Sequence, residues 1–418
     1  MNIKGLSKYK IIVKNTGYLS ILEVLKLAMP FIALPYIIRI VGGENYGLIA
    51  FVQTVVSYFS IIINFGLDVS AVKDVAILRN DKEQLSQLVS SVLCIKFFLW
   101  IFSSFILITC CLFFDVFRSN VLLIFFAYLS CFSDILFPVW YFQGIERMKY
   151  ITFVRFFSIL FYTISIFIFI HSSDDYIFIP LLQSLGMLLS GFISIYLLLV
   201  VEKIHLSFVS YSNMKAYFLA SIPFFISRLS LLINAGIAKI ICGIFFSMQS
   251  VAAFDIAQKI ANVAFIPLQM INQSVYPHLA RIRDRQFARK CFGFMCVCSS
   301  VVTLFIYIFA PLGIAFFAGE ELTEAVGILR ILCVFVFCGG ISLYLGTPLL
   351  VAFGYPRPFN VSVIGSTFVL IVIYLLLYYL DLFTVQTFAL VLGITELFIV
   401  LYRLYYCLKY KILYYNAT

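Results

Sequence analysis

The sequence predicts an all-α polytopic membrane protein with about twelve transmembrane helices in two bundles of six. Apolar residues make up 63% of the 418 residues and charged residues only 11%, and the mean hydropathy is +1.08. A water-soluble fold has too little interior to bury so much apolar surface. No polar stretch between the apolar segments is long enough for a soluble domain. We therefore expect the bilayer to surround nearly the whole chain.

Apolar segments of roughly 20 residues recur along the chain and define the predicted spans. They cover residues 18–40, 46–66, 88–113, 120–142, 151–171, 176–200, 217–241, 250–277, 291–317, 325–350, 359–380 and 384–407. We divide the chain into an N-terminal six-helix lobe, residues 1–205, and a C-terminal six-helix lobe, residues 206–418. Two further segments, 68–88 and 201–215, mix charged with apolar residues, which favours amphipathic helices at the membrane surface.

Positive charge is distributed unevenly over the segments outside the spans. With the amino terminus placed in the cytoplasm, 21 Lys and Arg residues fall on the cytoplasmic side, while only 2, Arg39 and Arg118, fall on the other. Lys and Arg concentrate in the cytoplasmic loops of membrane proteins, so both termini are expected in the cytoplasm. One missed or extra helix would invert every later loop. The asymmetry therefore also supports the number of spans.

The two halves of the chain resemble each other weakly. Residues 27–31 (Leu-Ala-Met-Pro-Phe) are similar to residues 219–224 (Leu-Ala-Ser-Ile-Pro-Phe). Six spans in each half would give both lobes the same orientation, as in transporters with parallel repeats and a V-shaped, MATE-like arrangement. Pro30 and Pro223 occupy corresponding places and are hinge candidates, because proline removes a backbone hydrogen bond. Ordinary membrane-helix proline, satisfied by its neighbours, is the alternative for each one.

Ionisable residues inside the predicted spans are the main functional signal. Each costs at least about 2.5 kcal/mol in hydrocarbon and is therefore expected to face protein or water. Positive charge prevails, and Arg228 lies too deep in the seventh span to reach the interface. We expect a water-filled cationic cavity between the lobes that selects anionic cargo. The candidate binding residues are Arg39, Arg228, Lys26, Lys239, Lys259 and Arg330, and Lys96 is a further buried cation.

Acidic residues inside the spans are candidates for binding the proton or Na⁺ whose gradient would drive transport. They are Asp255, Asp134, Glu23 and Glu396. Glu23 precedes Lys26 by three residues and Asp255 precedes Lys259 by four, so these pairs could instead be purely structural. Lys239 and Arg330 lie near predicted helix ends, where a side chain can also extend to the interface.

Several other classes of function lack the residues they require. The three histidines have no metal-ligand or catalytic spacing, and the eleven cysteines lie almost entirely in apolar segments. No phosphate-binding loop for ATP occurs, and the basic residues flank spans rather than forming a nucleic-acid-binding face. We therefore expect no metal, no cofactor, no bound ATP, no nucleic acid and no enzymatic activity.

A set of short motifs gives a family resemblance over nearly the whole chain. Residues 34–42 (Leu-Pro-Tyr-Ile-Ile-Arg-Ile-Val-Gly) are followed by Tyr46-Gly47, Tyr58-Phe59, Asn64-Phe65-Gly66, Pro138, Trp140-Tyr141-Phe142-Gln143-Gly144, Glu146, Met148 and Tyr276-Pro277. In this order and spacing they resemble the Wzx-type O-antigen and polysaccharide flippases. These belong to the multidrug/oligosaccharidyl-lipid/polysaccharide (MOP) exporter superfamily.

The resemblance implies two six-helix bundles that alternate in access to the two sides of the bacterial inner membrane. The implied cargo is an oligosaccharide repeat unit on undecaprenyl pyrophosphate, moved from the cytoplasmic to the periplasmic leaflet. Arg39 lies within the family-like motif. An O-antigen polymerase and a chain-length regulator are candidate partners, although the chain could also work alone.

Two other functions remain as alternatives. A MATE-like antiporter of drugs or organic cations should have an acidic cavity, which the excess of buried Lys and Arg disfavours. A polytopic O-antigen polymerase or ligase would need a long outer loop carrying reactive or sugar-binding residues. No predicted outer loop is long enough.

Overall fold

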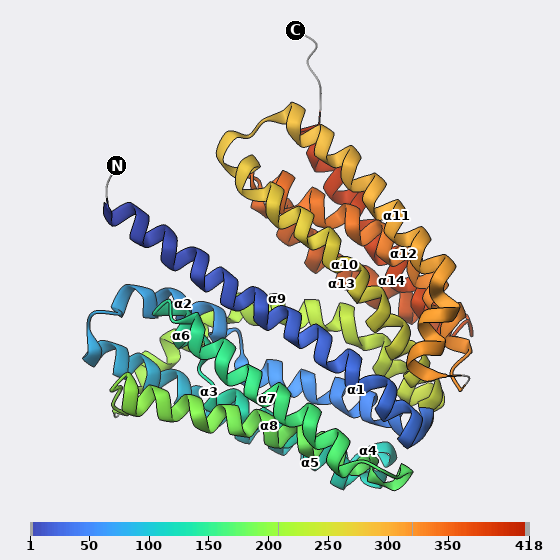
Figure 1. Cartoon of the computed structure of the whole chain (residues 1–418), viewed down its shortest axis with the longest axis horizontal. Coiled ribbons are helices and arrows are strands. Elements are labelled where there is room, and N and C mark those ends of the chain that lie inside the picture. The colour runs from blue at the N-terminus through green and yellow to red at the C-terminus, as the bar shows by residue number, and fades with distance from the viewer. Residues whose placement is uncertain (1–2, 208, 320, 414–418) are drawn as a thin grey trace. The chain divides into compact units, whose positions relative to one another are not determined.

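Long helices joined by short turns make up the chain in the computed structural model (Figure 1). The structure describes residues 3–207, 209–319 and 321–413, and among these the side chains of all except residues 3–28 and 30. No β-strand occurs in these described ranges. The all-α membrane fold predicted from hydropathy is therefore confirmed.

Contacts between helices divide the chain into two compact units, Met1–Leu229 and Ser230–Thr418. The boundary falls inside one long helix, α9 (Tyr211–Phe245). The sequence suggested lobes that meet between residues 205 and 206. That division into functional lobes stays a prediction, and the two units are described separately here.

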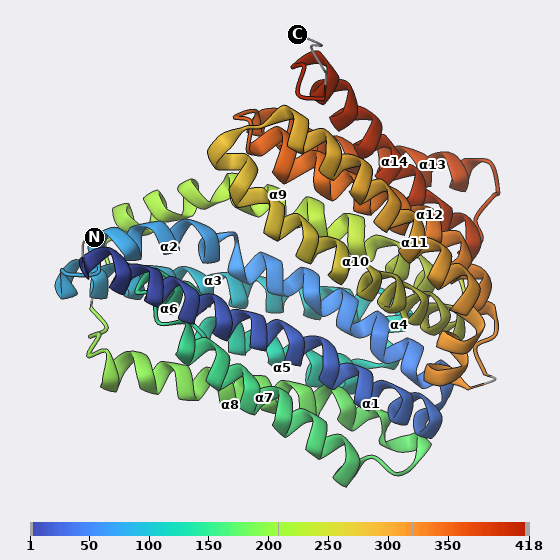
Figure 2. The ribbon, with the colours of Figure 1, turned by 45° about the horizontal axis from the view of Figure 1, so that its top comes forward.

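The first unit contains eight α-helices before α9, together with two short helical turns. They are α1 (Ile3–Asn64), α2 (Leu67–Leu78), α3 (Lys82–Phe113), α4 (Asp115–Ser119), α5 (Val121–Leu136), α6 (Val139–Gly144), α7 (Met148–Phe169), η1 (Ser173–Ile177), α8 (Phe178–Tyr196) and the π-helical η2 (Leu197–Val201). In both ribbon views α7 and α8 lie side by side (Figure 2).

The second unit is built around α12, which packs against three neighbouring helices, α10, α11 and α14. Its helices are α10 (Met248–Ile282), α11 (Arg285–Ala318), α12 (Glu324–Tyr344), the π-helical η3 (Leu345–Val351), α13 (Pro356–Tyr379) and α14 (Val385–Lys409). Each predicted span after residue 66 coincides, to within six residues at either end, with one helix of the structure or with two consecutive ones.

Helix α1 accounts for the first two predicted spans. It is 62 residues long, which corresponds to about 93 Å at 1.5 Å per residue, three times the thickness of the hydrocarbon core. Its regular backbone is broken at Gly42, where φ is 80° and ψ is 163°. Only glycine adopts this conformation readily. Eleven helical stretches of the described chain are long and apolar enough to cross a membrane. The break divides the first of these, so about twelve crossings are confirmed.

The segment 201–215 is not the amphipathic helix that its sequence suggested. Outside residue 208, the chain from residue 202 to residue 210 is not helical. The backbone N–H of His205 donates to the Ser86 hydroxyl at 3.2 Å, and that of Ser207 donates to the Ser90 hydroxyl at 2.9 Å. Two serines of α3 therefore satisfy backbone groups that a helix would have paired internally. The segment 68–88, by contrast, is mostly helical, as α2 and the start of α3.

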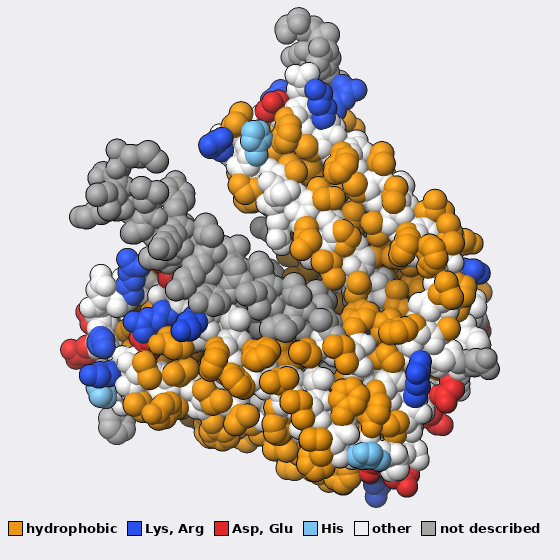
Figure 3. All heavy atoms as spheres, in the orientation of Figure 1, with side chains coloured by type: hydrophobic (Ala, Val, Ile, Leu, Met, Phe, Trp, Pro, Cys, Tyr) orange, Lys and Arg blue, Asp and Glu red, His pale blue; other side chains and the backbone are white. Residues whose placement is uncertain are grey.

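Apolar side chains cover the long sides of the helices on the visible face of the first unit, and charged side chains gather at the helix ends (Figure 3). On α3, for example, Phe98, Phe102 and Phe105 are more than half exposed. This pattern is the reverse of a soluble surface and is typical of helices surrounded by lipid.

Helix α6 packs its aromatic residues into the core of the first unit. Trp140, Tyr141 and Phe142 are almost completely buried. Gly144 brings α6 against α2, because a Cβ atom there would lie only 2.5 Å from a methyl carbon of Val75. The aromatic motif seen in the sequence thus anchors α6 beside α2.

The start of α9 is docked on the joint between α1 and α2. Phe65 lies between the rings of Phe218 and Phe225, with centroids 4.3 and 4.4 Å away. Gly66 has a φ of +71°, and a Cβ atom there would meet the Phe224 Cβ at 2.7 Å. The Ser70 and Ser221 hydroxyls are 2.7 Å apart. These contacts hold the first part of α9 to the first unit.

Candidate anion-binding cavity

The first unit encloses a polar cavity of about 420 Å³, within the range of small-ligand sites. Its described wall comes from seven helices and from Phe137, between α5 and α6. The lining residues are Asn64, Asp68, Val69, Val72, Lys96, Asp134, Phe137, Val139, Trp140, Gln143, Arg155 and Arg228.

Lys96 is the most deeply buried cation of the cavity, with only 1% of its surface exposed. It lies on α3, and its Nζ donates to the Asn64 side-chain oxygen at 2.7 Å and to the backbone carbonyl of Asp134 at 3.0 Å. A buried ammonium group needs such acceptors, because it has lost its hydration. The Asp134 carboxylate accepts a hydrogen bond from Ser60.

Two arginines complete the positive side of the cavity. The guanidinium of Arg155 on α7 lies 4.4 Å from the ring centroid of Phe137, a cation–π arrangement that supports a partly desolvated arginine. Arg228 on α9 forms an ion pair with Asp68 on α2, with 3.0 Å between Nη2 and Oδ2. Half of the Arg228 side chain is exposed, so a ligand can reach it.

The described lining carries three cations and two carboxylates. A guanidinium presents several N–H donors in a plane and binds phosphate oxygens in pairs, while a lysine acts as a point charge. The cavity is therefore suited to a group with several anionic oxygens, which would compete with Asp68 for Arg228.

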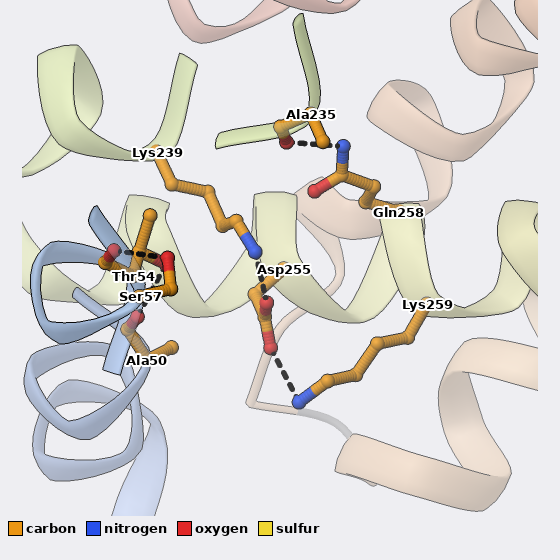
Figure 4. Close-up of polar contacts among 8 residues, drawn as sticks. All are labelled: Ala50, Thr54, Ser57, Ala235, Lys239, Asp255, Gln258 and Lys259. Carbon is orange, nitrogen blue, oxygen red and sulfur yellow. Dashed lines mark hydrogen bonds and ion pairs between the residues drawn. The ribbon is translucent and has the colours of Figure 1, made fainter. Parts of the chain in front are cut away.

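A second cluster of charges lies in the second unit (Figure 4). Asp255 on α10 is almost buried, with 4% of its side chain exposed, and it accepts from Lys239 at 3.0 Å and from Lys259 at 2.7 Å. Nearby, the Gln258 side chain donates to the Ala235 carbonyl at 2.9 Å. The predicted pair of Asp255 with Lys259 is present, and a lysine of α9 joins it.

A third group of charged residues is buried beside η3. Arg403 on α14 donates from Nη1 to the Ser342 carbonyl at 2.7 Å and from Nε to the Ser362 hydroxyl at 2.9 Å. The Ser342 hydroxyl in turn donates to the Glu396 carboxylate at 2.9 Å. This network connects α12, α13 and α14 through groups that would otherwise be unpaired.

The predicted site residues are thus distributed among several places. Arg228 and Asp134 line the cavity, and Lys239, Lys259 and Asp255 form the second cluster. Arg330 is exposed, with its guanidinium 5.2 Å from the Tyr307 ring centroid, and Arg39 is exposed near the break at Gly42. Pro223 lies inside α9. The side chains of Lys26, Glu23 and Pro30 lie outside the described residues.

Sequence reasoning missed two arginines inside helices. Arg155 and Arg403 lie inside α7 and α14, but neither was among the predicted site residues. Both residues fall within predicted spans, at 151–171 and 384–407. Their place in these spans could have identified them as charges inside the membrane. Lys96 was identified as a buried cation, but nothing in its apolar neighbourhood indicated a ligand site.

The chain is similar to known proteins in sequence and in fold. A protein of Escherichia coli (strain K12) named for O-antigen transport is 23% identical over 359 residues, which are 84% of this chain and 86% of its own. A solved multidrug resistance transporter of the MATE family and MOP superfamily, in an inward-facing conformation, is 17% identical, with coverage of 94% and 100% and a TM-score of 0.69. The lipid II flippase MurJ, in an inward closed conformation, is 12% identical, with coverage of 96% and 90% and a TM-score of 0.71.

The helices define a multi-pass membrane protein whose fold is similar to that of these two solved transporters. The chain belongs to the polysaccharide biosynthesis protein family, whose model matches residues 12–283. The resemblance predicted from the sequence motifs is confirmed.

Proposed function

We propose that this protein is a transporter, and specifically a flippase for oligosaccharide repeat units carried on a polyprenyl diphosphate such as undecaprenyl pyrophosphate. The repeat units would pass from the cytoplasmic to the periplasmic leaflet of the bacterial inner membrane by alternating access. The family, the O-antigen transport name of a relative and the fold shared with a lipid II flippase support the proposal.

The convergence of Lys96, Arg155 and Arg228 on one cavity is the observation that carries the proposal. These residues come from three helices, and a diphosphate supplies the matching anionic oxygens. The polyprenyl chain needs no polar site, because it can remain in lipid. An organic cation, the substrate class of the antiporter alternative, would meet an excess of positive charge in this cavity.

The predicted membrane topology supports this direction of transport. The lining residues Asp68 and Gln143 lie 11 and 4 residues before Arg79 and Arg147, which belong to predicted cytoplasmic loops. The lipid-linked repeat unit is a cytoplasmic-leaflet molecule before transport. The charge asymmetry of the loops thus supports the direction proposed here.

An ion gradient is the proposed source of energy. Of the acidic candidates whose side chains are described, Asp134 faces the cationic cavity, while Asp255 holds two lysines and Glu396 accepts from Ser342. Binding a proton or Na⁺ at Asp134 would change the charge that the diphosphate meets.

We further propose the O-antigen polymerase and the chain-length regulator as functional partners.

Complementation in cells tests the function. In a strain that lacks its own flippase, the wild-type gene should restore surface polysaccharide, and the Arg228→Glu variant should not, because it reverses the charge of the site. Arg330→Glu is the matched control, since Arg330 is exposed and lies outside the lining. Normal surface polysaccharide with Arg228→Glu, at an equal protein level, would contradict the proposal.

A further inference from the structure

A second cavity, of about 370 Å³, lies in the first unit and shares Arg155 with the anion-binding cavity. Among the residues whose side chains are described, its wall consists of one stripe of α7, two residues of α8 and one residue of α1. The lining residues are Met29, Arg155, Ser158, Ile159, Tyr162, Thr163, Gln183 and Met187. Residues 155, 158, 159, 162 and 163 follow the helical repeat and therefore lie on one face of α7.

The two helices that form this cavity are held close together by a glycine. A Cβ atom at Gly186 would lie 2.9 Å from the Ser158 carbonyl oxygen. On the next turn toward the start of α8, the Gln183 side-chain oxygen accepts from Gln53 on α1 at 2.7 Å. The wall is thus fixed by helix packing and by a hydrogen bond between side chains.

Apart from Arg155, the described lining is neutral. Thr163 is 7% exposed, and its hydroxyl is buried with no hydrogen-bond partner among the described residues. An unpaired buried hydroxyl is unfavourable, and a bound ligand can supply its missing hydrogen bond. Gln183 uses its side-chain oxygen for Gln53, so its amino group can donate to a ligand.

Apolar groups complete the wall. Met29, Ile159 and Met187 supply aliphatic surface, and Tyr162 supplies an aromatic ring. Hydroxyls and an amide set within an apolar wall match a ligand with polar edges and apolar faces. A sugar ring has this chemistry. A metal ion or organic cation would require carboxylates, which the described lining lacks.

The spacing of the lining residues along α7 also fits one continuous ligand. Ser158 and Thr163 follow Arg155 by three and eight residues, which corresponds to about 4–12 Å along α7. The first sugar of a lipid-linked oligosaccharide is bonded directly to the diphosphate. A diphosphate held at Arg155 would place that sugar in the neighbouring cavity.

We propose that the cavity around Thr163 and Gln183 is a binding subsite for the neutral sugar ring next to the diphosphate. This inference rests on the proposed function, and it goes further by assigning sugar recognition to the space between α7 and α8. Arg155 contacts the diphosphate side, while the hydroxyls and the amide contact the sugar.

Binding to the full-length protein in lipid nanodiscs tests the subsite with two probes, undecaprenyl diphosphate and undecaprenyl diphosphate that carries one hexose. The wild type should bind the glycosylated probe at least tenfold more tightly. Thr163→Val and Gln183→Leu should each remove most of this difference and leave the Kd of the bare diphosphate within twofold. Thr163→Val keeps the side-chain shape and removes a hydroxyl without a partner, so folding should be unaffected.

Gln87→Leu is the matched control, because Gln87 is exposed on α3 and belongs to neither cavity. If the wild type binds neither probe, the proposed function fails and the subsite with it. If the wild type binds both probes equally, or if both variants keep the full preference for the hexose, the subsite is refuted while the diphosphate site stands.

Discussion

The guanidinium of Arg228 lies 3.0 Å from the carboxylate of Asp68 at the edge of the anion-binding cavity. The two residues are 160 positions apart in the chain. Under the proposed function, Asp68 supplies the negative charge that a diphosphate would supply when bound. The ion pair would then compete with the ligand for Arg228.

Asp68→Asn is expected to strengthen diphosphate binding about three- to tenfold, because Arg228 loses its competing carboxylate. Arg228→Gln should weaken it by a similar factor. Isothermal titration of the purified protein with inorganic diphosphate measures both effects. Arg330→Gln serves as the control for loss of one positive charge. Equal or weaker binding by Asp68→Asn would argue against competition.

Lys96→Met is expected to lower the free energy of unfolding by about 3 kcal/mol, because the Asn64 oxygen and the Asp134 carbonyl both lose their donor in a buried place. Thermal unfolding in detergent measures this change. Lys215→Met, at an exposed position on α9, should change the stability by no more than about 0.5 kcal/mol. Equal stability of the two variants would show that the buried ammonium has no structural role.

Gly66→Ala is expected to impair transport although it removes no charged group. The new Cβ would collide with Phe224, and its φ of +71° disfavours alanine, so the start of α9 should shift and move Arg228. Gly293→Ala is the matched control, since nothing lies within 4 Å of its Cβ position. Complementation and diphosphate binding are the measurements. If Gly66→Ala complements and binds diphosphate as well as the wild type, the joint between α1 and α2 does not position Arg228.

Arg403→Met is expected to destabilise the protein by about 2–4 kcal/mol, because the Ser342 carbonyl loses its charged donor and Glu396 loses a nearby cation. Arg403→Lys should recover only part of the loss, since an ammonium cannot reproduce the planar fork. Arg289→Met, at an exposed position of α11, is the control. The measurement is the unfolding temperature of the wild type and of these three variants. Full recovery by lysine would mean that charge alone matters.

Hydropathy was sufficient to locate the helices because each span must satisfy its own backbone within the bilayer. For this reason the predicted spans after residue 66 coincide with the observed helices. The break at Gly42 also has a local cause, because only glycine readily adopts its positive φ. The helix predicted for the segment 201–215 was wrong for residues 202–207, because backbone N–H groups there donate hydrogen bonds to Ser86 and Ser90 of α3. That helix is more than 100 residues away in the sequence, so the local pattern could not indicate the contact.

The sequence by itself determined the fold class, the number of crossings and the excess of positive charge within the predicted spans. Only the tertiary structure decided which charges share a cavity. Lys96, Arg155 and Arg228 lie on three separate helices, and their meeting depends on side-chain packing at positions such as Gly66 and Gly144. Hydropathy is a property of each segment, whereas the partner of a buried charge is a property of the packed bundle.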